Sequence, residues 1–105
     1  SLEQIRELTK NQLITLLAIT IAMRVRDSNY VDLREIRNHA IAICEDLKIR
    51  RIEVEDYLDD LRIKNIIEFK SIKEIGIHSI SIDEIQTILR KQIKDYAMNG
   101  VRKRS

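Results

Sequence analysis

Residues 32–67 have the sequence DLREIRNHAIAICEDLKIRRIEVEDYLDDLRIKNII, and this stretch decides the fold because it predicts two helices, a tight connection and a strand. In the second helix, four apolar residues recur at i, i+3, i+4 and i+7 and so share one face: Val54, Tyr57, Leu58 and Leu61. Asn65 follows them and tolerates the left-handed backbone angles that end a helix. The β-branched and aromatic residues from Ile66 to Phe69 then predict a strand.

The first helix of this pair has a clear start. Asp32 is followed three residues later by Glu35, and each side chain can accept a hydrogen bond from a backbone N–H that the first turn leaves unpaired. The apolar positions that follow repeat at threes and fours: Leu33, Ile36, Ala40, Ile43, Cys44 and Leu47. Both helices therefore have one face to bury, which is typical of a helix-turn-helix.

Upstream, the sequence predicts a buried central helix. Residues 1–8, SLEQIREL, have apolar spacing that predicts a short helix, or a linker that ends a preceding one. Thr9 and Gln12 form a second capping pair, so a new helix should run from Lys10 to about Arg26. Because this helix is apolar on nearly all sides, it should be the support on which the pair packs. A turn at residues 27–29 and one very short strand at residues 30–31 should follow it.

Downstream, two alternating segments predict a β-hairpin, the wing. Residues 66–72 and 77–82 alternate apolar with polar side chains, and the loop between them, KEIG at residues 73–76, holds one of the two glycines. Ser81 or Asp83 should cap a last helix that reaches Ala97 and stops at Asn99 and Gly100, before a frayed basic tail. The predicted fold is mainly α with a small β-hairpin: a winged helix-turn-helix with an additional C-terminal helix, occupying residues 9–98, with the basic tail at residues 99–105.

Composition limits the classes of protein. A chain of 105 residues with 44% hydrophobic content is one small domain or a fragment. The net charge is only +2, but from Arg90 onward six basic residues accompany one acid, so the rest of the chain is net negative. Abundant charge of both signs beside an isoleucine-rich core resembles thermophile proteins. One cysteine excludes an internal disulfide, and no apolar run of 18 residues or signal peptide is present, which together favour a cytoplasmic protein without a membrane span.

Signatures of catalysis are missing. Two glycines cannot form a glycine-rich phosphate loop, and neither His39 with Cys44 nor the isolated His78 has the spacing of metal ligands. The neighbouring Asp59 and Asp60 are more typical of a solvated helix face than of a catalytic dyad. We therefore predict no enzyme, no cofactor and no metal.

Binding is the remaining class of function. A winged helix typically lays its third helix in the major groove and its wing against the minor groove, with Lys and Arg contacting phosphates. The candidate DNA-binding residues come from the third helix and its flanks, the wing and the tail: Arg50, Arg51, Arg62, Lys64, Lys70, Lys73, His78, Arg102 and Lys103. Deep insertion of the third helix is disfavoured, because its outward face carries five carboxylates, each unfavourable by about 1 kcal/mol near a phosphate: Glu53, Glu55, Asp56, Asp59 and Asp60.

Four segments carry a resemblance to a known family: LTKNQLITLLAI at residues 8–19, NYVDLREI at 29–36, ICEDLKI at 43–49 and VEDYLDDLRIKNII at 54–67. Over about residues 8–82 the chain resembles the C-terminal winged-helix domain of archaeal replication-origin initiators, which are related to the eukaryotic origin recognition complex and its cell-division-cycle helicase loader. The resemblance implies a role in DNA replication, binding to double-stranded DNA and other replication proteins as partners. In full initiators an ATPase domain precedes this module, so the resemblance implies either an excised domain or a stand-alone relative, with no nucleotide binding within these residues.

The chain also departs from the family pattern. The family commonly has an arginine pair just before the third helix, where this sequence has Ile52 and Glu53, and Arg50 and Arg51 lie two residues earlier. Asn65 stands where a glycine is usual. Because the two arginines are shifted from the family positions, we expect them to contact phosphates and not bases.

Two other functions remain open. The carboxylate-rich helix or the C-terminal helix could make the chain a protein interaction module of a replication or transcription assembly. Alternatively, residues 85–93 could pair two copies into a small dimeric transcription regulator. The sequence leaves the oligomeric state open.

Overall fold

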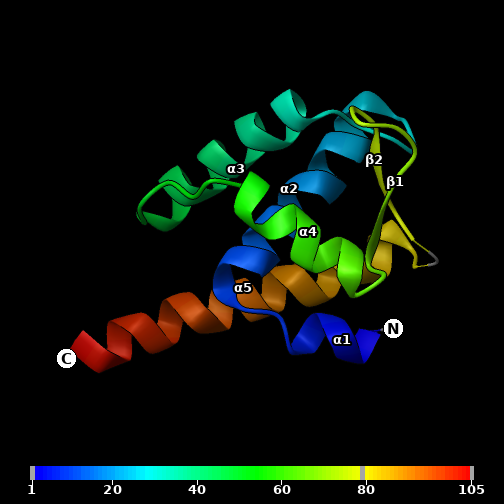
Figure 1. The fold of residues 1–105 in the computed structure, drawn as a ribbon. Helices are drawn as coiled ribbons and strands as arrows, with labels where there is room; N and C mark the ends of the chain where they lie inside the picture. The colour runs from blue at the N-terminus through cyan, green and yellow to red at the C-terminus, as the bar shows by residue number, and fades with distance from the viewer. Residues whose placement is uncertain (1, 79, 105) are drawn as a thin grey trace.

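The computed structural model describes the backbone of residues 2–78 and 80–104 and the side chains of residues 2–78 and 80–96. The elements follow in the order α1 (Leu2–Arg6), α2 (Lys10–Arg26), α3 (Leu33–Leu47), α4 (Glu55–Ile63), β1 (Ile67–Phe69), β2 (Ile75–Ile77) and α5 (Ile82–Arg104). The predicted class, mainly α with a small hairpin and an additional C-terminal helix, is confirmed, and the arrangement is winged-helix-like (Figure 1).

The central helix is α2. It begins at the predicted capping box, where the Gln12 N–H donates to Thr9 Oγ1 (3.3 Å) and the Thr9 N–H donates to Gln12 Oε1 (2.9 Å). Every side chain from Leu13 to Thr20 is buried, because α3, α4 and α5 all pack against this helix. The buried Gln86 of α5 donates to Thr20 Oγ1 (3.1 Å), so the polar groups at this contact are paired.

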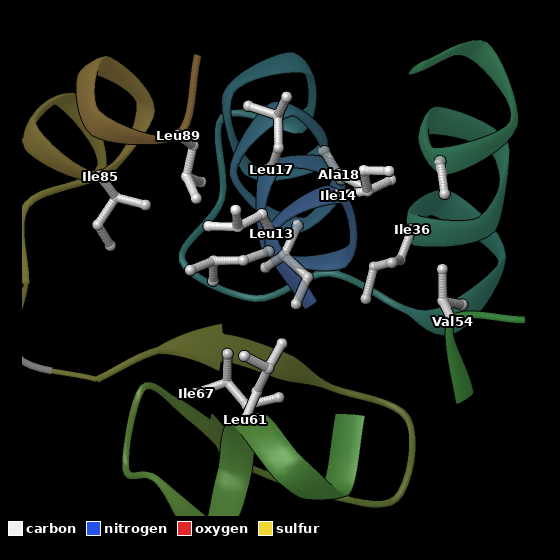
Figure 2. Close-up of a cluster of buried hydrophobic side chains, with 14 of the residues drawn as sticks. Leu13, Ile14, Leu17, Ala18, Ile36, Val54, Leu61, Ile67, Ile85 and Leu89 are labelled. Atoms are coloured by element: carbon white, nitrogen blue, oxygen red, sulfur yellow. The ribbon is translucent and has the colours of Figure 1, made fainter. Parts of the chain in front are cut away.

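The apolar faces of the other elements meet on α2. Figure 2 shows Leu13, Ile14 and Leu17 of α2 facing side chains from the neighbouring elements, namely Ile36, Val54, Leu61, Ile67, Ile85 and Leu89. All of them are buried, and burying a side chain of this size contributes roughly 1.5–3 kcal/mol relative to exposure. The apolar stripes predicted from the sequence are therefore the ones that form the core.

Three helices end at residues with left-handed backbone angles. Asp27, Lys48 and Asn65 have φ of 54°, 57° and 59°, as the position of Asn65 predicted. The left-handed Lys48 and Asn65 are each followed by an isoleucine whose N–H donates to a carbonyl five residues earlier. Ile49 donates to the Cys44 carbonyl (3.0 Å) and Ile66 donates to the Leu61 carbonyl (3.0 Å). This is the Schellman arrangement, and it turns an apolar side chain back towards the core.

The hairpin is shorter than predicted, and its second strand begins earlier. Ile67 pairs with Ile77 and Phe69 with Ile75, so the loop is residues 70–74, and the alternation at residues 77–82 belongs to no long strand. Val31 fixes the position of Ile75 through two backbone hydrogen bonds. The Val31 N–H donates to the Ile75 carbonyl (2.9 Å), and the Ile75 N–H donates to the Val31 carbonyl (2.8 Å). The predicted strand at residues 30–31 is thus a single antiparallel bridge.

Gly76 lies within β2 and not in the loop, contrary to prediction. A Cβ at this position would lie 2.6 Å from the Asn29 carbonyl oxygen and 2.9 Å from the Tyr30 ring. The glycine is therefore required by the close approach of the segment before α3, and it makes no turn.

The last helix is longer than predicted. It begins at Ile82, directly after Ser81, and continues past Asn99 and Gly100 to Arg104, so the predicted stop and frayed tail are wrong for the backbone. A glycine inside a helix costs only about 1 kcal/mol relative to alanine, and the hydrogen bonds of the continuing turns offset that cost. In Figure 1 the C-terminal part of α5 projects beyond the other helices. In the residues that the structure describes, no helix is both long and apolar enough to cross a bilayer.

Candidate nucleic-acid interface

The hairpin brings together two of the predicted DNA-binding residues, Lys70 and His78. Lys70 Nζ lies 4.9 Å from the centre of the Tyr30 ring. The Tyr30 hydroxyl donates to Glu68 Oε1 (3.1 Å), and His78 Nδ1 lies 3.6 Å from Glu68 Oε2. The hydrogen bond and the negative charge of Glu68 raise the pKa of Tyr30. Lys70 and His78 are thus held on the hairpin around one tyrosine and one carboxylate.

The hairpin loop is organised by its own hydrogen bonds. The Lys70 N–H donates to the Glu74 carbonyl (2.9 Å), and the Lys73 N–H donates to Ser71 Oγ (3.3 Å). Between these residues Ile72 is 94% exposed. Lys73 is a predicted DNA-binding residue, whereas the exposure of Ile72 was not predicted, because an isoleucine inside an alternating segment predicts a buried strand position.

The connection between α3 and α4 carries Arg50 and Arg51, both exposed. Arg51 lies 3.7 Å from the Glu45 carboxylate, and both side chains are about two-thirds exposed, so solvent screens this pair. Val54 precedes α4 without a side-chain cap, and the N–H groups of Asp56 and Tyr57 in the first turn donate to the carbonyls of Glu53 and Val54 (both 3.0 Å). At this end of α4 the groups that can contact a phosphate are therefore the two arginine side chains.

The outward face of α4 is acidic, as predicted: four of the five predicted carboxylate residues lie on this helix, Glu53 lies just before it, and all five are exposed. Glu55 accepts two hydrogen bonds from Arg37 of α3 (3.1 and 2.7 Å), which lower the pKa of Glu55. Asp60 accepts from Gln12 Nε2 (3.3 Å). Asp56 has no hydrogen-bond or ion-pair partner among the described side chains.

The predicted contacts on α4 differ in availability. Arg62 donates to Asp59 one turn earlier (3.3 Å), so its charge is partly matched within the helix. Lys64, at the C-terminal end of the helix, is exposed.

The predicted DNA-binding residues lie on several separate elements of the backbone. In Figure 1 the α3–α4 connection and the hairpin lie on opposite sides of α4, and the end of α5 projects away from both. Arg102 and Lys103 belong to the last turns of α5, and their side chains lie outside the described residues. Cations therefore flank the acidic helix from separate elements.

The described residues offer no evident alternative chemistry. No three His, Cys, Asp or Glu side chains among them are grouped as metal ligands. Cys44 is buried as predicted, and burial raises the pKa of its thiol. A surface pocket of about 360 Å³ lies between the end of α2 and the start of α5, where Arg24 is paired with Asp83.

The face proposed for a dimer is occupied by the chain itself. Ile85 and Leu89 are fully buried and Ile93 is 5% exposed, because α5 packs against α2 and α1. These three side chains are therefore not free to pair two copies, whereas Ile88 in the same segment is only partly buried. The dimeric regulator stays a prediction.

Comparison with solved structures gives an informative likeness. No family model and no curated protein sequence matches the chain. Among solved structures, the chain is similar to Cdc6p from Pyrobaculum aerophilum, with a TM-score of 0.84 and 26% sequence identity over 92% of this chain and 27% of that one. The chain thus spans about a quarter of that protein's length. The likeness supports a relation to Cdc6-type proteins and agrees with the resemblance found in the sequence.

Proposed function

We propose that this chain is a DNA-binding winged-helix domain of an origin-initiator-like replication protein. It contacts duplex DNA through the start of α4, the hairpin and the basic end of α5. The observation that carries the proposal is the structural likeness to Cdc6p, which extends over nearly the whole chain. The charges of the described surface support it and restrict how the domain can dock.

Docking must keep α4 out of the floor of the groove. Four exposed carboxylates lie on this helix and a fifth, Glu53, lies just before it, and each one brought near a phosphate is unfavourable by about 1 kcal/mol before screening. Exposed cations stand at both ends of α4 and on the hairpin: Arg50, Arg51, Lys64, Lys70 and Lys73. A shallow approach lets these cations bridge neighbouring phosphates while α4 remains above the bases.

The salt dependence of binding tests this arrangement. Fluorescence anisotropy on a labelled duplex should give an affinity that falls steeply with salt, because each neutralised phosphate releases counterions. Arg50→Ala and Lys73→Ala should each reduce the slope of log K against log salt by about one.

The matched control is Arg6→Ala on α1, an exposed arginine on the helix that packs against α5. Its slope should equal that of the wild-type chain. If the wild-type chain shows no duplex binding at low salt, the proposed function is wrong.

A second candidate function is protein binding through the outward face of α4. The exposed and unpartnered Asp56, with Asp59 one turn later, favours it. Charge reversal at both positions, Asp56→Lys with Asp59→Lys, separates the two functions. DNA affinity should increase if α4 faces the duplex, whereas capture of replication proteins should be lost if this face binds a partner.

A further inference from the structure

The hairpin loop presents one large apolar side chain to solvent. Ile72 is 94% exposed, and the rest of the loop, Lys70, Ser71, Lys73 and Glu74, is polar and exposed. The hydrogen bonds from Lys70 to Glu74 and from Lys73 to Ser71 fix the loop backbone on both sides of the isoleucine. Its projection is therefore built into the loop.

We propose that Ile72 acts as a wedge that enters the DNA minor groove and partly unstacks one base step, so that the duplex bends. This inference rests on the proposed function and adds to it a residue and a mode of sequence preference. Apolar side chains at the tips of minor-groove-binding elements act in this way, at a cost of a few kcal/mol of stacking that the bent duplex offsets with additional contacts.

The chemistry of the loop favours DNA over a protein pocket. A stable protein interface buries about 1,200–2,000 Å² and has an apolar centre, and here a single isoleucine is surrounded by polar residues. Lys70 and Lys73 lie two residues before and one residue after Ile72, where they can contact the phosphates that border a minor groove. Val25 and Ile63, also strongly exposed, lie on helices, and neither is held at the tip of a loop.

A wedge gives sequence preference without hydrogen bonds to bases. Pyrimidine–purine steps such as TA unstack more easily than AA steps. The chain should therefore prefer a duplex with TA at the step beneath the loop, by about tenfold, a ratio within the range of one altered base pair.

Bending and unstacking can be measured directly on the 105-residue chain. Duplexes that carry TA or AA at one position receive a donor and an acceptor dye at their ends, and 2-aminopurine is placed at each step in turn. The wild-type chain should bend the TA duplex by about 20–90° and raise 2-aminopurine fluorescence at one step. Ile72→Ser should abolish both signals and the preference for TA while the salt slope stays unchanged, and Ile72→Leu should retain all three.

Val25→Ser is the matched control, because Val25 is 72% exposed on α2, and its bending should equal that of the wild type. Binding by the wild type without bending overturns the wedge but leaves the proposed function intact, whereas absence of duplex binding overturns both. Bending by Ile72→Ser equal to the wild type also overturns the wedge. The wedge is likewise overturned if Ile72→Ser impairs the binding of another protein and leaves DNA bending unchanged.

Discussion

The ion pair between Arg37 and Glu55 ties α3 to the first turn of α4. The guanidinium donates two hydrogen bonds to the carboxylate, which also lies near the positive end of the α4 dipole. Both features stabilise the ionised carboxylate, and its pKa is lowered. The orientation of α4 relative to α3 is thus linked to one titrating group.

This ion pair predicts a pH dependence of stability. Because the pKa of Glu55 is lower in the folded chain, its contribution is fully present above the unfolded-state pKa of about 4.3 and is lost as the pH falls through the folded-state value. Arg37→Ala should therefore be less stable than the wild type at pH 7, and the difference should shrink on acidification.

Urea unfolding at a series of pH values measures this difference. Arg34→Ala is the control, because Arg34 is exposed on the same helix and has no ion pair among the described residues. A difference between Arg37→Ala and the wild type that is independent of pH contradicts the prediction.

Gly76 predicts a steric effect. Gly76→Ala should lower the free energy of unfolding by about 1–3 kcal/mol, because the added Cβ would meet the Asn29 carbonyl, a backbone atom, at 2.6 Å. Urea denaturation of Gly76→Ala measures the loss, and Ser71→Ala in the exposed loop should change stability by no more than about 0.5 kcal/mol. Equal stability of the two variants contradicts the expected clash.

Local residue chemistry was predictable where neighbours in sequence decide it. The capping boxes at Thr9 and Asp32 and the left-handed Asn65 all follow from residues within one turn. Gly76 was misplaced because its requirement comes from Asn29, which is distant in sequence. The sequence did not indicate the positive φ of Lys48, because lysine has no preference for that region. The packing of the following, partly buried Ile49 against the core favours this conformation.

At the scale of elements, the stability of the hairpin depends on the burial of its strand residues. Strands of three residues are marginal alone, and β1 and β2 are held by the bridge to Val31 and by the burial of Ile67 and Ile75. The sequence predicted a longer hairpin because alternation continues to Ile82, although the start of α5 takes up the last of these positions.

Two isoleucines of the same hairpin give a matched test. Ile75 is 2% exposed and Ile72 is 94% exposed, so the same substitution removes the same atoms from opposite environments. Ile75→Ala should lower the free energy of unfolding by about 2–5 kcal/mol, and Ile72→Ala by less than about 0.5 kcal/mol. Thermal or urea denaturation compares the two, and equal losses contradict the burial of this strand.

For the whole molecule, the sequence was sufficient for the class of fold and the faces that are buried. The apolar positions of α2 indicated the central helix before any neighbour was known. The sequence alone could not indicate how the cations are distributed around α4, because their positions depend on the packing of α3, the hairpin and α5. The residues predicted to contact DNA are therefore separate basic groups on several elements around an acidic helix.

The basic end of α5 predicts a measurable share of the DNA affinity. Removal of residues 99–105 takes away Arg102, Lys103 and Arg104, so the salt slope should fall by up to about three. The melting temperature should change little, because Ile85, Leu89 and Ile93, the apolar α5 residues that are buried among the described side chains, precede the cut. Replacing the three basic residues with glutamine keeps the chain length and should give the same slope, and an unchanged slope in both variants excludes this end from the interface.

The long helix α5 connects the helical core with a part of the molecule that projects beyond it. Its earlier turns are wedged against α2, and Gln92 donates to the Arg6 carbonyl of α1 (3.1 Å), while its far end stands clear of the body (Figure 1). Because α1 packs against α5 and accepts this hydrogen bond, we expect a displacement of the C-terminal end of α5 to be transmitted to α1. A partner that binds the C-terminal part of α5 should therefore also affect the position of the N-terminal helix.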